Sequence, residues 1–426
     1  MKKVFFKTFG CRTNVVDTQI MISKLKDFDV VFNEDDADII VINSCTVTNS
    51  ADSTVRNYIN SLQKLQSNKN KTNHIKKKPR IVFTGCGVWT KGESLFNKNK
   101  IDALFGASEK QNINRLLKNE NRFFKAGDLK FIDNTIIDKM VGKNKAFVKI
   151  QEGCDFRCSY CIIPYVRGNS RSYDESKILK QITLLASNGF GEFILTGTNL
   201  GSYGKGAKRR DGLAILLKKI SQIRGVRRVR LGSVEPTQIT DEFKELLEES
   251  WMAKHLHIAL QHTTKEMLNL MNRRNKLKSD LELFEYIANK GYALGTDFIV
   301  GHPGESDAIW KKAINNIKQF PLTHLHAFTY SKRDGTPSST MKDQIPKDIA
   351  KKRLKELNGI IDEKNYQFRK RKQKLEVLIE QEKNGKYIGY DQFFNQIEIK
   401  SKIDLVGDWI YIKDYKVNKD MNSGTF

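Results

Sequence analysis

Two hydrophobic periods alternate along the first 120 residues of the chain. Short apolar runs typical of strands cover residues 3–9, 38–43 and 81–84, and the segments 14–25 and 52–65 between them have helical spacing. The segment 101–106, followed by the helical pattern of 109–118, continues this alternation. The pattern is typical of an α/β fold, and it predicts a doubly wound parallel sheet as an N-terminal domain over residues 1–120.

A second alternating series begins near Lys145. Six strand-like runs are separated by helical patterns, and they cover residues 146–151, 192–196, 228–232, 256–261, 296–300 and 325–330. Six β/α units are two short of a complete eight-unit barrel. The sequence therefore predicts a central partial (β/α)6 barrel in a domain over residues 140–368.

The last part of the chain has a different pattern. A basic helical stretch over residues 351–374 is followed by short strand-like segments at 375–381, 387–391, 395–400 and 409–415. Short strands joined by loops over about fifty residues predict a small all-β barrel, which we assign to residues 371–426.

Charge adds a partner to this picture. The 426 residues include 74 Lys and Arg against 49 Asp and Glu, a formal net charge of +25. Such an excess favours a polyanionic partner such as nucleic acid, although a lysine-rich composition without a partner is the alternative. No apolar run approaches the length of a membrane span, and the first residues do not resemble a secretory signal. We therefore expect a cytoplasmic protein without membrane contact.

Three of the six cysteines lie in one short loop, GCDFRCSYC, directly after the first strand of the predicted barrel. Cys154, Cys158 and Cys161 have C-x3-C-x2-C spacing, and the nearest downstream histidine is His255. A local zinc finger would need four protein ligands, whereas a 4Fe-4S cluster held by three thiolates keeps one iron open for an exogenous ligand. The spacing favours such a cluster.

The other three cysteines each follow a predicted strand of the N-terminal domain. Cys11, Cys45 and Cys86 come within about two residues of the ends of the runs 3–9, 38–43 and 81–84. The carboxyl ends of parallel strands share one edge of the sheet, so the three sulfurs are expected to converge on a second cluster. The alternative is that they are ordinary buried thiols.

The cysteine loop in this context resembles the radical S-adenosylmethionine (SAM) enzymes, and GCDFRCSYCIIPYVRGNSRS is similar to their methylthiotransferase branch. The resemblance covers nearly the whole chain. GCRTN, NSCTVTN and TGC resemble the cysteine motifs of that branch's N-terminal domain, and the last fifty or so residues are placed like its TRAM RNA-binding domain. The segments KIQEGC, SVEPTQITDE, HLHIALQ, IVGHPGE and YSKRDGTP most resemble the enzymes that act on N6-threonylcarbamoyladenosine in tRNA. One loop departs from the family pattern, because Gln261-His262-Thr263-Thr264 stands where small residues are expected.

The resemblance implies two 4Fe-4S clusters, with ligand sets Cys154/Cys158/Cys161 and Cys11/Cys45/Cys86, and SAM as a cofactor. The first cluster would cleave SAM to a 5′-deoxyadenosyl radical, and the second would carry the sulfur that becomes a methylthio group on C2 of the adenine at position 37. The residues expected to contact SAM are Tyr160, Thr196, Gly197, Ser233 and Glu235. Tyr160 fits barrel packing equally well.

The implied partners are the anticodon stem-loop of tRNA, an electron donor such as flavodoxin or ferredoxin, and a sulfur donor. Basic residues that follow the first two barrel strands or lead into the small barrel are candidates for phosphate contacts: Arg167, Arg171, Lys208, Arg209, Arg210 and the run from Arg369 to Lys374.

Two alternatives remain open. The same chemistry could act on isopentenyl-adenosine in tRNA or on an aspartate of a small-subunit ribosomal protein; Thr46-Val47-Thr48 stands where the isopentenyl branch tends to have Ser-Val-Arg. The second alternative is a non-catalytic RNA-binding protein with a structural metal. This alternative predicts a fully ligated metal and no SAM binding.

Overall fold

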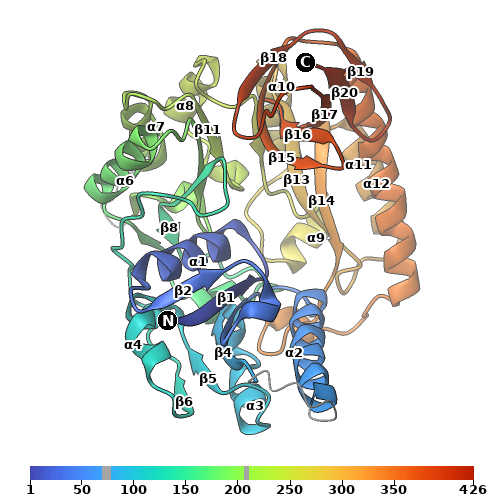
Figure 1. Ribbon diagram of the computed structural model, residues 1–426. Coiled ribbons are helices and arrows are strands. Elements are labelled where there is room, and N and C mark those ends of the chain that lie inside the picture. The colour runs from blue at the N-terminus through green and yellow to red at the C-terminus, as the bar shows by residue number, and fades with distance from the viewer. Residues whose placement is uncertain (70–77, 206–210) are drawn as a thin grey trace.

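The computed structural model describes residues 1–69, 78–205 and 211–426, and Figure 1 shows how three parts of the chain are stacked. The N-terminal sheet lies at one end, the C-terminal sheet lies at the other, and the β/α units of the middle part lie between them. Within the described residues, no helix has the length and apolar character needed to cross a membrane.

Residues 2–125, apart from the undescribed 70–77, form a parallel sheet of six strands in the order β2-β1-β3-β4-β5-β6. The strands are β1 (Lys2–Thr8), β2 (Phe28–Val31), β3 (Ile39–Ser44), β4 (Arg80–Gly85), β5 (Ala103–Phe105) and β6 (Phe123–Lys125). Helices α1 (Arg12–Lys24) and α4 (Ile113–Lys118) cover one face, while α2 (Asn49–Lys69) covers the other. The predicted doubly wound sheet is confirmed. The predicted strands did not include β2 and β6, which have four and three residues and largely exposed or half-buried side chains, so they carry little hydrophobic pattern.

The middle part consists of two three-stranded parallel sheets, ordered β11-β10-β7 and β12-β13-β14. Parallel bridges between Val229 and Met252 and between Val234 and Ile258 join them into one curved wall, as the predicted partial barrel requires. The strands are β7 (Ala146–Lys149), β10 (Glu192–Thr196), β11 (Arg228–Leu231), β12 (His255–His257), β13 (Ala293–Val300) and β14 (Leu322–Thr329). The segment predicted as a strand over 256–261 ends at His257, and residues up to Gln261 continue as irregular chain beside β13.

Helices cover the outside of this wall: α6 (Glu175–Ser187), α7 (Gly212–Ser221), α8 (Asp241–Glu245), α10 (Leu277–Asn289), α11 (Asp307–Gln319) and α12 (Lys347–Lys370). Helix α1 of the N-terminal sheet lies against β7 (Figure 1), and its Val16 and Ile20 belong to the same apolar core as the barrel residues Phe147 and Val148. The N-terminal domain therefore shares its core with the barrel.

The C-terminal residues form a curled sheet ordered β18-β15-β16-β17-β20-β19, a half-barrel consistent with a TRAM-like domain. Its strands are β15 (Leu375–Lys383), β16 (Lys386–Tyr390), β17 (Gln396–Lys400), β18 (Trp409–Ile412), β19 (Tyr415–Val417) and β20 (Asn422–Thr425). The short β20, which has little apolar pattern, was not predicted. The turn between β16 and β17 reaches the barrel, where Phe394 lies 5.1 Å from the ring of His255.

Candidate active site

The loop with C-x3-C-x2-C spacing is held by a small hairpin of β8 (Gln151–Glu152) and β9 (Arg171–Ser172). Gly153, directly before Cys154, has φ +74°, and a Cβ at this position would lie 2.0 Å from the backbone oxygen of Asn169. Only glycine fits this close approach. Cys158 is buried, while Cys154 and Cys161 are half-buried. Burial and the neighbouring Cys158 raise the pKa of the Cys161 thiol to about 12, so ligation by this sulfur requires loss of a firmly held proton.

Two polar side chains that the sequence analysis did not identify contact this loop. The Asn199 amide lies 3.7 Å from Cys154 Sγ, and the Arg273 guanidinium lies 3.9 Å from Cys158 Sγ. Arg273 also forms a bidentate pair with Glu235, at 2.8 and 2.6 Å. Asn199 follows β10 in the loop that begins with Gly197, and this position at a barrel strand end is the signal that could have identified it.

The five residues predicted to contact SAM have different surroundings. Glu235 and Cys158 line one cavity together with Asn272 and Arg273. Thr196 is buried at the end of β10, and a Cβ on Gly197 would lie 2.9 Å from the backbone oxygen of Gln151.

The other two predicted contacts make specific interactions of their own. Ser233 Oγ lies 3.2 Å from Asp297 Oδ2, a carboxylate that also pairs with His257 and His326. Tyr160 packs with Met267, Met271 and Ile299. These apolar surroundings agree with the alternative that Tyr160 is a packing residue of the barrel.

The segment Gln261-His262-Thr263-Thr264 is buried and structural. His262 is fully buried 3.5 Å from Glu305 Oε1, and the Thr264 side chain caps α9 (Lys265–Leu270) by accepting a hydrogen bond from Met267 N. Some of their polar atoms have partners, since His262 Nδ1 accepts from Thr264 N at 3.2 Å and Asn316 donates to the Thr263 backbone oxygen at 3.1 Å. Among the described residues, however, Gln261 Oε1 and His262 Nε2 are buried without a hydrogen-bond partner.

Cys11, Cys45 and Cys86 follow β1, β3 and β4, which are direct neighbours in the N-terminal sheet. The edge of the sheet brings these strand ends together. Gly10, at φ +101°, packs so closely on Cys45 that a Cβ would lie 2.5 Å from Cys45 Cβ and 3.0 Å from its sulfur. Burial raises the pKa of the Cys86 thiol to about 12 even though Arg167 acts in the opposite direction.

Arg167 joins this second set to the first. It is the last residue of α5 (Ile163–Arg167), which begins directly after the loop of Cys154, Cys158 and Cys161. Its Nε donates a hydrogen bond to Cys86 Sγ at 3.0 Å, and its Nη2 donates to Asn14 Oδ1 at 2.7 Å. The predicted phosphate contact of Arg167 is wrong, because this side chain is only 4% exposed and fully engaged inside the protein.

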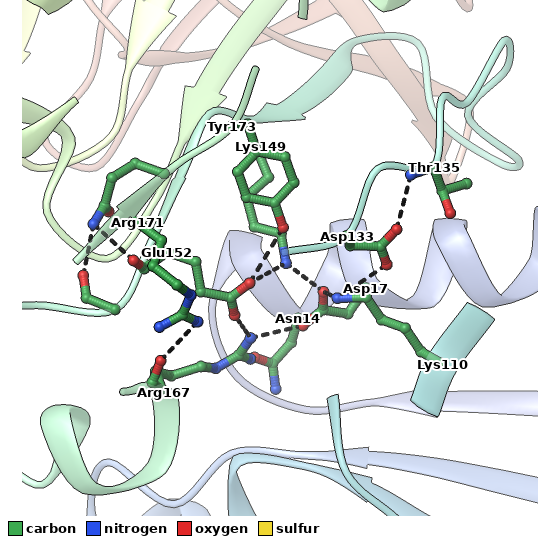
Figure 2. Close-up of polar contacts among 12 residues, drawn as sticks. Asn14, Asp17, Lys110, Asp133, Thr135, Lys149, Glu152, Arg167, Arg171 and Tyr173 are labelled. Atoms are coloured by element: carbon green, nitrogen blue, oxygen red, sulfur yellow. Dashed lines mark hydrogen bonds and ion pairs between the residues drawn. The ribbon is translucent and has the colours of Figure 1, made fainter. Parts of the chain in front are cut away.

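A buried ionic network surrounds Arg167 (Figure 2). Asp17 of α1 accepts from Lys110, Lys149 and Arg167 at 2.7, 2.6 and 2.8 Å, and Glu152 accepts from Lys149 and Arg167 at 3.1 and 2.5 Å. Burial acts to raise the pKa of Glu152, but Lys149 and Arg167 outweigh it and lower the pKa to about 2. Lys110, Lys149 and Arg167 likewise hold the pKa of Asp17 well below its usual range, so both carboxylates are ionised. Asp17 joins helix α1 of the N-terminal domain to Lys149 and Arg167 of the barrel, whereas Glu152 pairs with the same two cations within the barrel part.

Helix α5 links the two cysteine sets. Cys86 packs with Ile162 and Val166, and Ile162 directly follows Cys161. All six cysteines of the chain belong to the two sets, so neither has a fourth cysteine, and this donor chemistry fits 4Fe-4S clusters that each keep one open iron. In the described parts of the chain, no three His, Cys, Asp or Glu side chains are spaced as ligands of a single metal ion.

The remaining basic candidates divide by exposure. Arg369 is buried and donates to the backbone oxygens of Asn418 and Lys419, so its predicted phosphate contact is also wrong. Lys370, Arg371, Lys372 and Lys374 of the same run are exposed, and the half-buried Arg171 donates to the backbone of Arg167 and Asn169. Lys208, Arg209 and Arg210 lie outside the described residues.

Comparison with known proteins gives matches over the whole chain. Residues 3–106 match the uncharacterized protein family UPF0004, and residues 148–317 match the Radical SAM superfamily. A protein of Helicobacter pylori strain J99 named "Putative methylthiotransferase" is 51% identical, with 100% of both chains covered. The threonylcarbamoyladenosine tRNA methylthiotransferase MtaB of Bacillus subtilis is 30% identical over 100% of this chain and 96% of its own.

Two further similarities concern a second tRNA enzyme and the fold. The tRNA-2-methylthio-N(6)-dimethylallyladenosine synthase of Halalkalibacterium halodurans is also 30% identical, over 97% of this chain and 79% of its own. The solved structure of TsrM, a radical S-adenosylmethionine methyltransferase from Kitasatospora setae with cobalamin and a 4Fe-4S cluster bound, covers 80% of this chain and 77% of its own with a TM-score of 0.60. At 14% sequence identity, this likeness concerns the fold alone.

Proposed function

The chain belongs to the radical SAM methylthiotransferase family, and we propose that it adds a methylthio group to C2 of N6-threonylcarbamoyladenosine at position 37, next to the anticodon of tRNA. The observation that carries this proposal is the pair of three-cysteine sets, one on each domain and linked by α5, which follows Cys161 and packs against Cys86. The whole-length similarity to MtaB supports the choice of substrate.

The cofactors follow from the two donor sets. Cys154, Cys158 and Cys161 would hold one 4Fe-4S cluster, and Cys11, Cys45 and Cys86 would hold the second. With SAM, such clusters supply the radical and the sulfur needed to substitute an unactivated aromatic C–H bond, which is beyond acid–base catalysis by side chains. Asn199 and Arg273 donate toward the first set, and Arg167 donates toward the second.

SAM contacts are assigned to Tyr160, Thr196, Gly197, Ser233 and Glu235 around the first set. In this proposal, the domain over residues 1–120 holds the second cluster. The domain over residues 140–368 binds SAM and forms the radical, and the domain over residues 371–426 binds RNA. The partners are the tRNA anticodon stem-loop, an electron donor such as flavodoxin or ferredoxin and a sulfur donor, all in the cytoplasm. The single-stranded anticodon loop lets the target base leave its stack without melting a helix.

A second substrate is supported by one comparison. The dimethylallyladenosine synthase is as similar to this chain as MtaB is, at 30% identity, which favours the isopentenyl-type base as the alternative substrate.

The experiment uses the reconstituted full-length chain with SAM, a reductant and a sulfide source. Three tRNA substrates are compared, carrying threonylcarbamoyladenosine, isopentenyl-adenosine or unmodified adenosine at position 37, and nucleosides are analysed by mass spectrometry. A methylthio product on the threonylcarbamoyl substrate is expected. A product only on the isopentenyl substrate would replace the proposal by the alternative, and SAM cleavage without any tRNA product would point to the ribosomal-protein substrate.

A further inference from the structure

Arg167 is a buried cation that the proposed function does not by itself require. It lies six residues after Cys161, at the end of α5, and only 4% of it is exposed. A guanidinium loses strong hydration on burial, so it is retained inside a protein only where its charge and donors are matched.

The N–H groups of Arg167 are directed to both domains. Nη1 donates to Asp17 at 2.8 Å and to Glu152 at 2.5 Å, and Nη2 donates to Asn14 at 2.7 Å. Asn14 itself donates to the backbone oxygens of Phe9 and Ser44, the residues that precede the Gly10-Cys11 pair and Cys45. Arg167 therefore holds the frame of the second cysteine set through Asn14 as well as through Cys86.

The contact with Cys86 is the closest polar side-chain contact that the structure gives to a cysteine sulfur among the described residues. Nε lies 3.0 Å from Cys86 Sγ, whereas Asn199 lies 3.7 Å from Cys154 and Arg273 lies 3.9 Å from Cys158. Hydrogen bonds to ligand sulfurs and nearby charge are two of the factors that set the reduction potential of an iron–sulfur cluster. A cation that donates to a sulfur stabilises the reduced, more negative cluster.

We propose that Arg167 is a positioning residue that raises the reduction potential of the cluster on Cys11, Cys45 and Cys86 and fixes that cluster relative to the SAM loop through α5. The inference rests on the proposed second cluster. Asp17 and Glu152 act in the opposite direction, because their negative charges compensate Arg167 on the side away from Cys86.

The test measures the potential of the second cluster alone. In a background with Cys154, Cys158 and Cys161 replaced by Ala, redox titration followed by electron paramagnetic resonance reports only this cluster. Arg167→Met is expected to shift the potential to a more negative value, because this variant lacks both the donor and the positive charge. Glu152→Gln is expected to shift the potential to a more positive value, because the positive charge of Arg167 remains while one of the two carboxylates that compensate it is removed.

The opposite signs separate an electrostatic role from simple loosening of the interface, which would move both variants in the same direction. Arg171→Met is the matched control, since this neighbouring arginine contacts the backbone oxygens of Arg167 and Asn169. The potential of the second cluster in this variant should equal that of the parent. Arg167→Lys keeps the charge and should fall between the parent and Arg167→Met.

Equal potentials for the parent and Arg167→Met, or shifts of the same sign for Arg167→Met and Glu152→Gln, would overturn the inference. If Arg167→Met does not retain iron, the potentials of Glu152→Gln and Arg167→Lys test the inference instead. Potentials equal to that of the parent in both variants would overturn it. Absence of iron from the Cys154/Cys158/Cys161 background itself would instead overturn the proposed second cluster.

Discussion

At the scale of single residues, a glycine with positive φ stands directly before a cysteine in both sets. Gly10, Gly85 and Gly153 have φ of 101°, 91° and 74°, and they precede Cys11, Cys86 and Cys154. In each case a Cβ would lie within 2.5 Å of a neighbouring atom: Cys45 Cβ, the backbone oxygen of Ser44 and the backbone oxygen of Asn169, respectively. The cysteine is thus turned out of its strand where no other residue fits the backbone.

Gly10→Ala tests this arrangement. The left-handed conformation costs about 1 kcal/mol for alanine, and the contact with Cys45 would also displace that cysteine. We expect loss of iron from the second set, about four atoms per chain, together with lower thermal stability. Gly291→Ala is the control, because Gly291 has φ +81° but nothing within 4 Å of a Cβ, so it should lose some stability and keep all its iron. Equal iron contents for the two variants would contradict this explanation.

At the scale of elements, the start of β10 and β11 is where the barrel meets the C-terminal sheet. Glu192 on β10 lies between Arg228 and Arg230 on β11, and all three are almost fully buried. The two arginines continue to backbone oxygens of Glu376 and Asp391 in the C-terminal sheet. Glu192 is therefore the carboxylate shared by the two cations that hold the domains together, and Glu376 adds a second, longer contact to Arg228 at 3.8 Å.

Glu192→Gln should destabilise the protein by about 3 kcal/mol at pH 7, because it removes the carboxylate of the buried Arg230 and leaves the buried Arg228 with only the Glu376 carboxylate at 3.8 Å. Burial acts to raise the pKa of Glu192, but Arg230 and Arg228 outweigh it and lower the pKa to about 2. A carboxyl with a lowered folded-state pKa contributes stability above its unfolded-state pKa and loses it as pH falls. Urea unfolding should therefore show the gap between parent and variant shrinking by about 2 kcal/mol from pH 7 to pH 3. A gap independent of pH would show that Glu192 is not ionised in the folded protein.

At the scale of the whole molecule, the basic side chains behind the net charge of +25 differ in their surroundings: some are buried in ion pairs and others are exposed. Some of the 74 Lys and Arg side chains are paired inside the protein, as Lys110, Lys149 and Arg167 are with Asp17 and Glu152. Exposed cations remain where α12 enters the C-terminal sheet, and Lys370 and Lys374 there lie 4.4 Å from the rings of Tyr366 and Tyr411. Removal of the entire C-terminal sheet would expose Arg228 and Arg230, so surface substitutions give the cleaner test of RNA binding.

Replacing Lys370, Lys372 and Lys374 together by Gln should weaken tRNA binding and reduce its salt dependence. Removing one lysine–phosphate interaction lowers the slope of log affinity against log salt by about 0.7 to 0.9, so a fall of about 2 is expected if these lysines face the backbone. The control replaces three exposed lysines of the outer helices α10 and α11, which are Lys278, Lys311 and Lys318. Equal slopes for the two triple variants, measured by filter binding over a salt series, would place recognition elsewhere on the molecule.

The two cysteine sets lie on different domains, so their activities should separate. The parent should hold about eight iron atoms, and replacement of either set by Ala should leave about four. Without Cys154, Cys158 and Cys161, cleavage of SAM to methionine and 5′-deoxyadenosine should stop. Without Cys11, Cys45 and Cys86, cleavage should continue while the methylthio product disappears, as measured by chromatography and nucleoside mass spectrometry. Full methylthiolation in the second variant would show that these three cysteines hold no cluster that the reaction needs.

Local pattern determined much of this protein. The alternation of strands and helices was sufficient to predict the parallel strands of both the N-terminal domain and the barrel, because side chains buried on one face repeat with the period of their element. The position of Cys11, Cys45 and Cys86 after strands was sufficient to place them at one sheet edge, since parallel strands end on the same side. The loop of Cys154, Cys158 and Cys161 is continuous in sequence, so its chemistry could be inferred directly.

Only the tertiary structure decided how the parts are joined. In the sequence, nothing distinguishes Arg167 and Arg369 from arginines that are exposed. In the structure both are buried, and they contact residues far along the chain, such as Asp17 and Asn422. Helix α1 shares the barrel core, and Phe394 of the C-terminal sheet reaches His255. These contacts join residues more than 50 positions apart, and no local period records them. The sequence determined which residues could hold metal, and packing between domains decided which cations remain free to meet RNA and which one contacts Cys86.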